Sequence, residues 1–229
     1  MSRERRCESA FHPVGLPDAD LFHCSDCERW VDAHCEGWFA MDGDTIRCDP
    51  CEYKATGRRA PDHGLPPPRG SVGYAARLAA VPHDVTPRGL TLIRPWAWAV
   101  ASAGKDVENR TWVAPRVAVG GWLAIHAGQK WDAEAVAFIR ARVDTTRRDV
   151  PTKEADTSGA IVAVAQLAEV LTASESPWFS GPYGWRLDNV VQLPAPVPCK
   201  GAQGLWSLPS DVLANVRAGV ERLRAESRP

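Results

Sequence analysis

Two pairs of cysteines, each with two residues between its members, lie close together near the start of the chain. Cys24 and Cys27 form the first pair, and Cys48 and Cys51 form the second. Each Cys-x-x-Cys turn presents two thiolates from one tight loop, and two such turns complete the tetrahedron that Zn²⁺ prefers. Redox-active or unligated cysteines are the alternatives, but two pairs at this separation favour zinc. Because a segment of about fifty residues cannot bury enough apolar area to fold alone, we expect the metal to supply folding free energy.

The sequence between the two pairs carries a second set of candidate ligands. Trp30, Cys35 and Gly37 stand at the spacings of a PHD finger, and the segment resembles this family, whose members bind two zinc ions. Asp32 stands where the family has His. With the types of side chain available, the resemblance implies a second zinc site made of Cys7, His12, Asp32 or His34, and Cys35. The alternative is a single zinc ion, with His12 and His34 as ordinary surface histidines.

Cysteine usage and charge restrict the setting in which the protein works. The chain has 229 residues and seven cysteines, an odd number that favours reduced, metal-binding thiols in the cytoplasm over a disulfide framework. Its basic start leads into Cys7 rather than an apolar stretch, so we expect no secretion signal, and we expect no membrane span. Residues 1–70 carry a net charge of −4 and residues 71–229 one of +3. Neither half is basic enough to bind DNA by charge alone, so a nucleic-acid function must depend on a local site.

Composition divides the chain into three parts. Residues 1–54 hold the cysteine-rich segment, and we expect them to form the small zinc domain. Residues 55–88 are rich in Pro, Gly and Arg, which predicts a semi-rigid linker, with a short helix near residues 74–78. Residues 89–229 then alternate strand and helix signals, and we expect them to form the second domain.

Apolar runs and capping residues predict the elements of this second domain. We expect strands over residues 90–94, 121–126, 159–166, 183–193 and 203–208. Helices are predicted over residues 95–103 and 132–143, with Gly104 closing the first, and a last helix begins at an N-cap, Ser210. Residues 144–158 are polar and without periodicity, so we expect a mobile loop there.

Motifs spread over residues 90–209 resemble those of the ASCH family. The segment Gly104-Lys105-x-x-Glu108-x-Arg110 corresponds to the family's core motif Gly-x-Lys-x-x-Glu-x-Arg, with the glycine one place off. Further matches follow at Trp122-Leu-Ala-Ile-His126, Tyr183-Gly-Trp185 and Lys200-Gly-x-Gln-Gly-Leu-Trp206. The resemblance implies a PUA-like β-barrel, related to domains that bind RNA or modified bases. We therefore expect an α+β fold, in which a PUA-like β-barrel with flanking helices follows a small PHD-like or treble-clef zinc domain.

The charged residues of the core motif are the first candidates for a binding site. In an extended segment, Glu108 and Arg110 lie on the same face, because side chains repeat every second residue. A carboxylate can accept hydrogen bonds from an exocyclic amine, while Lys105 and Arg110 can hold a phosphate or a base carbonyl. The alternative is a buried ion-pair network that joins the preceding helix to the barrel.

Aromatic residues supply candidate stacking surfaces. Eight of the ten tryptophans follow residue 89, and we expect Trp122 and Trp206 to lie in the core. Rings near turns could stack on an extruded base, and these are Trp96, Trp98, Trp178, Tyr183 and Trp185. Lys200, in a Gly/Pro-lined loop, is a candidate for a phosphate contact. His126 is either a satisfied histidine at the rim or a polar group of the pocket.

Three functions are compatible with these patterns. The first is a nucleic-acid-binding module that recognises RNA or a modified base, with the zinc finger contacting a partner or a second site. The second is a hydrolase acting on RNA or a modified nucleoside, with Lys105 and Glu108 as catalytic residues. The ASCH-like amidohydrolases carry Thr at the place of Glu108, so their nucleophile is missing here. The third is a protein-interaction adaptor whose PHD-like finger binds a peptide.

Overall fold

The computed structural model divides the chain into two compact units, residues Met1–His63 and Gly64–Pro229. It describes four short strands of the first unit, and residues 72–142 and 149–227 of the second. In the first unit, β1 (Leu21–His23) pairs antiparallel with β2 (Trp30–Asp32), and β3 (Trp38–Ala40) pairs antiparallel with β4 (Ile46–Cys48).

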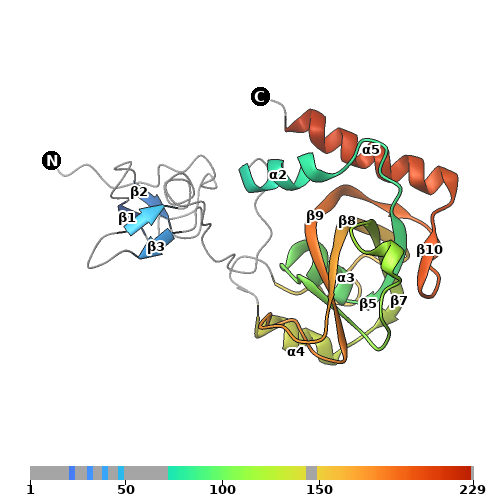
Figure 1. Ribbon diagram of the computed structural model, residues 1–229, viewed down its shortest axis with the longest axis horizontal. Helices are drawn as coiled ribbons and strands as arrows, with labels where there is room; N and C mark the ends of the chain where they lie inside the picture. Colours follow the sequence, from blue (N-terminus) through green and yellow to red (C-terminus); the bar gives the residue numbers. More distant parts are fainter. Residues whose placement is uncertain are drawn as a thin grey trace. The chain divides into compact units, whose positions relative to one another are not determined.

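The second unit is built on a six-stranded mixed sheet (Figure 1). The strands run in the order β10-β5-β7-β8-β9-β6. Their bounds are β5 Arg88–Arg94, β6 Val107–Arg110, β7 Trp122–Trp131, β8 Ala160–Leu171, β9 Tyr183–Pro198 and β10 Leu205–Ser207. Among the described strands of this sheet, β5 and β7 alone pair in parallel. Over the described residues no ladder joins the edge strands β10 and β6, so the hydrogen-bonded sheet is open.

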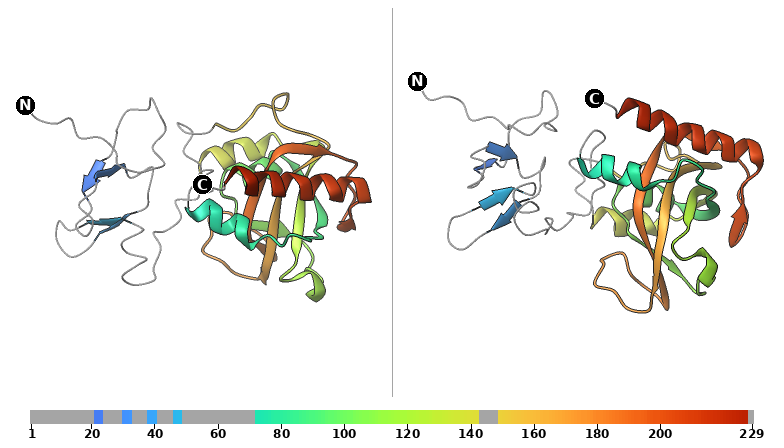
Figure 2. Two further views of the ribbon diagram at one scale, coloured as in Figure 1. Left: turned by 90° about the horizontal axis from the view of Figure 1, so that it is seen from above. Right: turned by 45° about the horizontal axis from the view of Figure 1, so that its top comes forward.

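Four α-helices cover this sheet, which confirms the predicted α+β class. Their bounds are α2 Val72–Ala80, α3 Trp96–Ser102, α4 Glu134–Arg140 and α5 Ser210–Glu226. Helices α2 and α5 lie side by side on one face of the sheet, whereas α3 lies within its curve (Figures 1 and 2). A short 3-10 helix, η1 (Arg116–Ala118), precedes β7.

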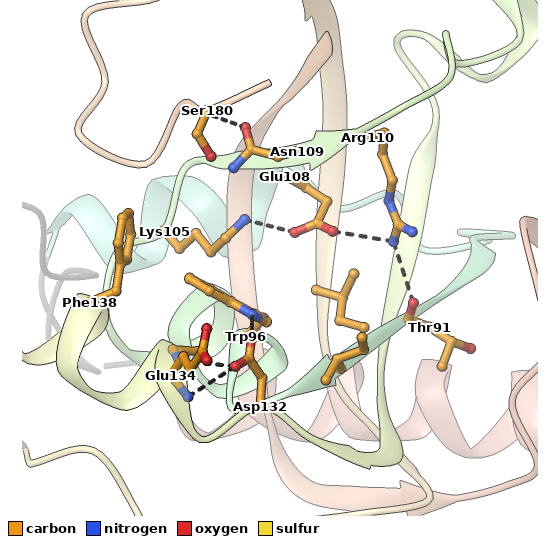
Figure 3. Close-up of a pocket in the computed structure, with 13 residues that line it drawn as sticks. Thr91, Trp96, Lys105, Glu108, Asn109, Arg110, Asp132, Glu134, Phe138 and Ser180 are labelled. Atoms are coloured by element: carbon orange, nitrogen blue, oxygen red, sulfur yellow. Dashed lines mark hydrogen bonds and ion pairs between the residues drawn. The ribbon is translucent and has the colours of Figure 1, made fainter. Parts of the chain in front are cut away.

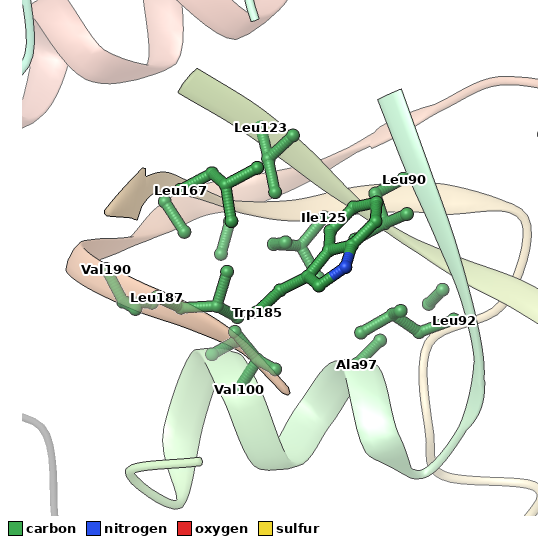
Figure 4. Close-up of a cluster of buried hydrophobic side chains, with 14 of the residues drawn as sticks. Leu90, Leu92, Ala97, Val100, Leu123, Ile125, Leu167, Trp185, Leu187 and Val190 are labelled. Carbon is green, nitrogen blue, oxygen red and sulfur yellow. The ribbon is translucent and has the colours of Figure 1, made fainter. Parts of the chain in front are cut away.

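The described residues form three apolar clusters, of which the sheet separates the two largest, while the third packs α3 and α4 around Trp178. Within the curve, Trp185 is fully buried among side chains of β5, β7 and α3 (Figure 4). On the other face, α2 and α5 pack on β8 and β9 through Val164, Val191 and Val216. Because both faces of β8 are covered, its sequence is almost continuously apolar instead of alternating.

The second half of the predicted linker belongs to this fold. Tyr74 and Leu78 of α2, followed by Val81 and Val85, are buried in the core beneath α5. The short helix predicted near residues 74–78 is confirmed as part of α2, but residues 72–88 are not a linker, because their apolar side chains recur at a spacing of three to four and form one buried face.

Several predicted boundaries also shift. The helix predicted over residues 132–143 is the shorter α4, and the last helix already includes Ser210, with Pro209 rather than Ser210 at its N-cap. The mobile loop was predicted over residues 144–158. Of these, residues 144–148 lie outside the described residues. Residues 149–158 are held by Arg94, whose buried guanidinium donates to the carbonyls of Lys153 and Asp156, each at 3.0 Å.

Candidate functional site

A cavity of about 530 Å³ opens between β5, β6, α3 and the start of α4 (Figure 3). Its volume lies within the range of small-molecule sites. The lining combines charged, polar and aromatic side chains with a few apolar ones. The lining residues are Thr91, Leu92, Ile93, Trp96, Lys105, Glu108, Asn109, Arg110, Asp132, Glu134, Ala135, Phe138 and Ser180.

Three charged side chains form one row along a wall of this cavity (Figure 3). Nζ of Lys105 lies 2.7 Å from Oε2 of Glu108, and Nη2 of Arg110 lies 3.3 Å from Oε1 of the same carboxylate. The side chains of Lys105 and Glu108 are only 2% and 11% exposed. The structure thus brings together the three residues of the core motif, and it contains the ion-pair network that was the structural alternative.

Local backbone geometry explains why these three side chains meet. Gly104 has a φ of 72°, a left-handed conformation that suits glycine, and it turns the chain at the end of α3. The backbone N–H of Lys105 then donates to the carbonyl of Ala99 at 3.1 Å, and its ammonium also donates to the carbonyl of Val107. Because β6 is extended, Glu108 and Arg110 project to the same side, as the spacing predicted.

Arg110 links the row to β5 and to the core. Its Nη2 donates to the carbonyl of Thr91 at 3.4 Å, and its guanidinium lies 5.9 Å from the ring centroid of Trp185. Its Nε is buried and has no hydrogen-bond partner within the described part of the chain. This unpaired N–H is enclosed within the wall of the cavity.

Two aromatic rings, those of Trp96 and Phe138, also line the cavity (Figure 3). The ring of Trp96 packs edge-on against Phe138 with their centroids 5.6 Å apart, and Nζ of Lys105 lies 5.8 Å from the Trp96 ring centroid. The indole N–H of Trp96 donates to Oδ2 of Asp132 at 3.1 Å. Trp96, a predicted stacking residue, is therefore half-buried with a fixed ring that lines the cavity.

Asn109 positions the loop at the mouth of the cavity. Its amide N–H donates to the carbonyl of Trp178 at 2.8 Å, and its Oδ1 accepts the backbone N–H of Ser180 at 2.8 Å. Asn109 was not among the residues predicted for the site, although it stands between Glu108 and Arg110, which were. Asp132, Phe138 and Ser180 were also missed, because they come from distant segments and belong to no motif.

Other predicted contact residues do not line this cavity. The stacking prediction is wrong for Trp185 and Trp178, whose exposed fractions are 0% and 3%, because both rings fill the core. Tyr183 and Lys200 lie outside the lining, and Lys200 is exposed to solvent. Trp98 instead lines a second cavity of about 160 Å³, together with Asp156.

His126 and the two tryptophans predicted for the core lie in or against the second core. The ring of His126 is buried, its Nε2 donates to the carbonyl of Cys199 at 3.1 Å, and Trp206 packs edge-on against it. Burial lowers the pKa of His126, and the Cys199 carbonyl opposes that shift. Trp122 and Trp206 are half-buried against the second core, so their core assignment holds in part.

Most predicted zinc ligands fall outside the described residues. Asp32 and Cys48 stand at the ends of β2 and β4, whereas Cys7, His12, Cys24, Cys27, His34, Cys35 and Cys51 are not described. Within the described ranges, no three His, Cys, Asp or Glu side chains gather as a metal site would require. The two predicted zinc sites therefore stay predictions.

The chain was also compared with known proteins. No protein-family model matches it, and no curated protein sequence matches it. Among the described helices, none is both long enough and apolar enough to pass through a membrane.

Proposed function

We propose that the second unit binds nucleic acid, RNA or DNA, by taking a single natural or modified base into the cavity lined by Lys105, Glu108 and Arg110. The observation that carries this proposal is the placement of Glu108. Its carboxylate is held between two cations on the wall of a cavity that the rings of Trp96 and Phe138 also line. A ring stacked on Trp96 or Phe138 would turn its polar edge toward this row, and aromatic stacking combined with hydrogen bonds to the base edge is how unstacked bases are recognised.

The curvature of the sheet supports the proposed relation to PUA-like barrels and to the ASCH family. Arg110 of β6 reaches the carbonyl of Thr91 on β5, and both strands enclose the core around Trp185. We propose that side-chain contacts of this kind close the barrel where the backbone ladder does not.

We further propose that the first unit is a PHD-like zinc finger that contacts a protein partner or a second nucleic-acid site. The order of its strands supports a shared metal. Strands β1 and β4 contact one another; β1 ends at the residue before Cys24, and β4 ends at Cys48, the first cysteine of the second pair. Four thiolates fit a structural Zn²⁺, which would fix the ends of these short strands and leave no open coordination position.

Binding to labelled oligonucleotides tests the proposed function. The full chain would be titrated into mixed-sequence single-stranded RNA, single-stranded DNA and duplex DNA at two salt concentrations, with fluorescence anisotropy as the readout. We expect Arg110→Gln to weaken binding to the preferred polymer about tenfold or more, since a charge-assisted contact is lost. Arg186→Gln is the matched control, because Arg186 forms an exposed ion pair with Glu169 outside the cavity. Absence of binding to all three polymers would refute the proposal.

A hydrolase acting on RNA or a modified nucleoside is the second candidate. The distance of 2.7 Å between Nζ of Lys105 and Oε2 of Glu108 allows proton transfer between them within the cavity. Incubation with RNA and with N4-acetylcytidine, followed by chromatography, tests this activity. Products that form with the natural chain and not with Lys105→Met would support catalysis, and intact substrates would leave binding as the function.

A further inference from the structure

We infer that the base this cavity accepts is guanine, an inference that rests on the proposed function and specifies its ligand. Only some of the charged groups on the cavity wall can face a ligand. Lys105 is 2% exposed and already donates to Glu108 and to the carbonyl of Val107, so it positions the carboxylate and does not reach a ligand itself. Glu108 and Arg110 remain, with side chains 11% and 21% exposed.

These two side chains present a defined order of hydrogen-bonding groups. Oε2 of Glu108 accepts a hydrogen bond from Lys105 and Oε1 forms an ion pair with Arg110, and each oxygen keeps a further lone pair, because a carboxylate oxygen can accept twice. Arg110 can only donate, since a guanidinium has no acceptor. Along the row, the ligand therefore meets one donor followed by two adjacent acceptors (Figure 3).

Guanine has the complementary edge. Its O6 accepts, while N1–H and the 2-amino group donate side by side, so O6 would face Arg110 and the two donors would face Glu108. Cytosine places acceptors at N3 and O2 opposite the carboxylate, and adenine places one at N1. Uracil offers a single donor between two acceptors. Each of these bases would set a lone pair against the negative charge of Glu108, and such unpaired contacts produce strong discrimination.

Inosine provides a test that needs no change in the protein, since its base is guanine without the 2-amino group. The full chain would be titrated into short uridine oligonucleotides that carry one central guanosine, inosine, adenosine or cytidine, with the all-uridine oligonucleotide as reference. We expect guanosine to bind about tenfold to 150-fold more tightly than inosine, the range for one hydrogen bond to a charged group.

A substitution identifies the group that reads the amine. Glu108→Gln replaces one acceptor by a donor, so the preference for guanosine over inosine should fall to nearly one. Glu169→Gln is the matched control, because it also breaks a Glu–Arg ion pair, of 2.7 Å, but on the exposed surface of β8 and β9. That control should keep the full preference. If Glu108→Gln does not fold, the guanosine–inosine comparison on the natural chain still decides the inference.

The outcomes separate the two proposals. Equal binding of guanosine and inosine, or tighter binding of adenosine or cytidine, would overturn the guanine assignment and leave nucleic-acid binding standing. Failure of every oligonucleotide, including mixed-sequence RNA and DNA, would overturn the proposed function itself.

Discussion

The indole N–H of Trp96 donates a hydrogen bond to Oδ2 of Asp132, while Oδ1 of the same carboxylate accepts the backbone N–H groups of Glu134 and Ala135. All three distances are 3.1 Å. One side chain therefore fixes both an aromatic wall of the cavity and the first turn of α4, from which Phe138 projects. The shape of the cavity depends on this carboxylate, although Asp132 need not touch a ligand.

Asp132→Ala should lower the free energy of unfolding by about 1–2 kcal/mol, because it removes the acceptor for the first backbone N–H groups of α4. Nucleic-acid binding should weaken as well, since the Trp96 ring loses its anchor. Asp132→Asn keeps an amide oxygen for the backbone groups and should lose less stability. Urea denaturation and anisotropy titrations measure the two effects. If Asp132→Ala unfolds at the same urea concentration as the wild-type chain and binds oligonucleotides equally well, this carboxylate does not organise the cavity.

Glu108→Gln should lower the free energy of unfolding by about 3–5 kcal/mol, because it leaves the buried ammonium of Lys105 without its counter-ion. The double variant Lys105→Met with Glu108→Leu should recover most of this loss, since apolar side chains of similar volume often replace a buried ion pair without cost. Denaturant melts of both variants and of the natural chain give the comparison.

The same variants separate a structural role of the ion pairs from a binding role. A double variant that is stable but binds no oligonucleotide would assign the row to recognition. A double variant that is stable and binds as well as the natural chain would contradict the proposed function, because the charges would then serve the fold alone.

The sequence predicts local relationships well. The strand spacing of Glu108 and Arg110, the turn at Gly104 and the helix that follows Pro95 all depend on neighbouring residues, and the structure confirms them. The apolar spacing of Tyr74, Leu78, Val81 and Val85 was equally local. The sequence predicted a short helix at residues 74–78, but its burial in the second unit was missed because the Pro-rich composition before it indicated a linker.

Contacts between residues that are far apart in the sequence could not be predicted from neighbouring residues. Trp185 pairs with Glu108 across the β9–β6 ladder, but only the curvature of the sheet shows that its ring points into the core. Asn109 contacts Trp178 and Ser180 about 70 positions further along the chain, and no motif encodes that contact. Those loops and strands meet because the whole sheet folds.

Acid should destabilise the second unit through His126. Burial lowers the pKa of His126 in the native state, whereas in the unfolded chain its pKa is about 6.5. As the pH falls, the unfolded chain therefore takes up a proton before the native state does. The stability contributed by the neutral ring is complete above about pH 6.5 and is lost as the pH falls below that value. His126→Gln keeps a donor for the Cys199 carbonyl but cannot titrate. Its loss of stability between about pH 7.5 and about pH 5.5 should therefore be smaller than that of the natural chain. Equal losses would contradict this assignment.

Asp156 should act in the opposite direction. Burial raises its pKa despite the nearby positive charge of Arg94, and its Oδ2 has no hydrogen-bond partner among the described residues. The native state therefore bears a cost at neutral pH that disappears as the pH falls below the unfolded value of about 3.9. Asp156→Asn should raise the melting temperature at neutral pH, with a gain that shrinks on acidification. Glu154→Gln, an exposed neighbour, is the control and should change little. A lower melting temperature in Asp156→Asn would show that the charge stabilises this loop.

Removal of zinc should unfold the first unit and leave the second intact. Each described ladder of the first unit joins only three residue pairs, and an isolated two-stranded ladder of that length is marginal in water.

We expect metal analysis of the natural chain to find about one or two zinc ions per chain. Cys24→Ser should lose the ion held by Cys24, Cys27, Cys48 and Cys51, and Asp32→Ala should lower a count of two to one. After chelation, limited proteolysis should degrade residues 1–63 and spare residues 72–227. A metal-free first unit that resists protease would refute the prediction, because so small a core should not fold without its ion.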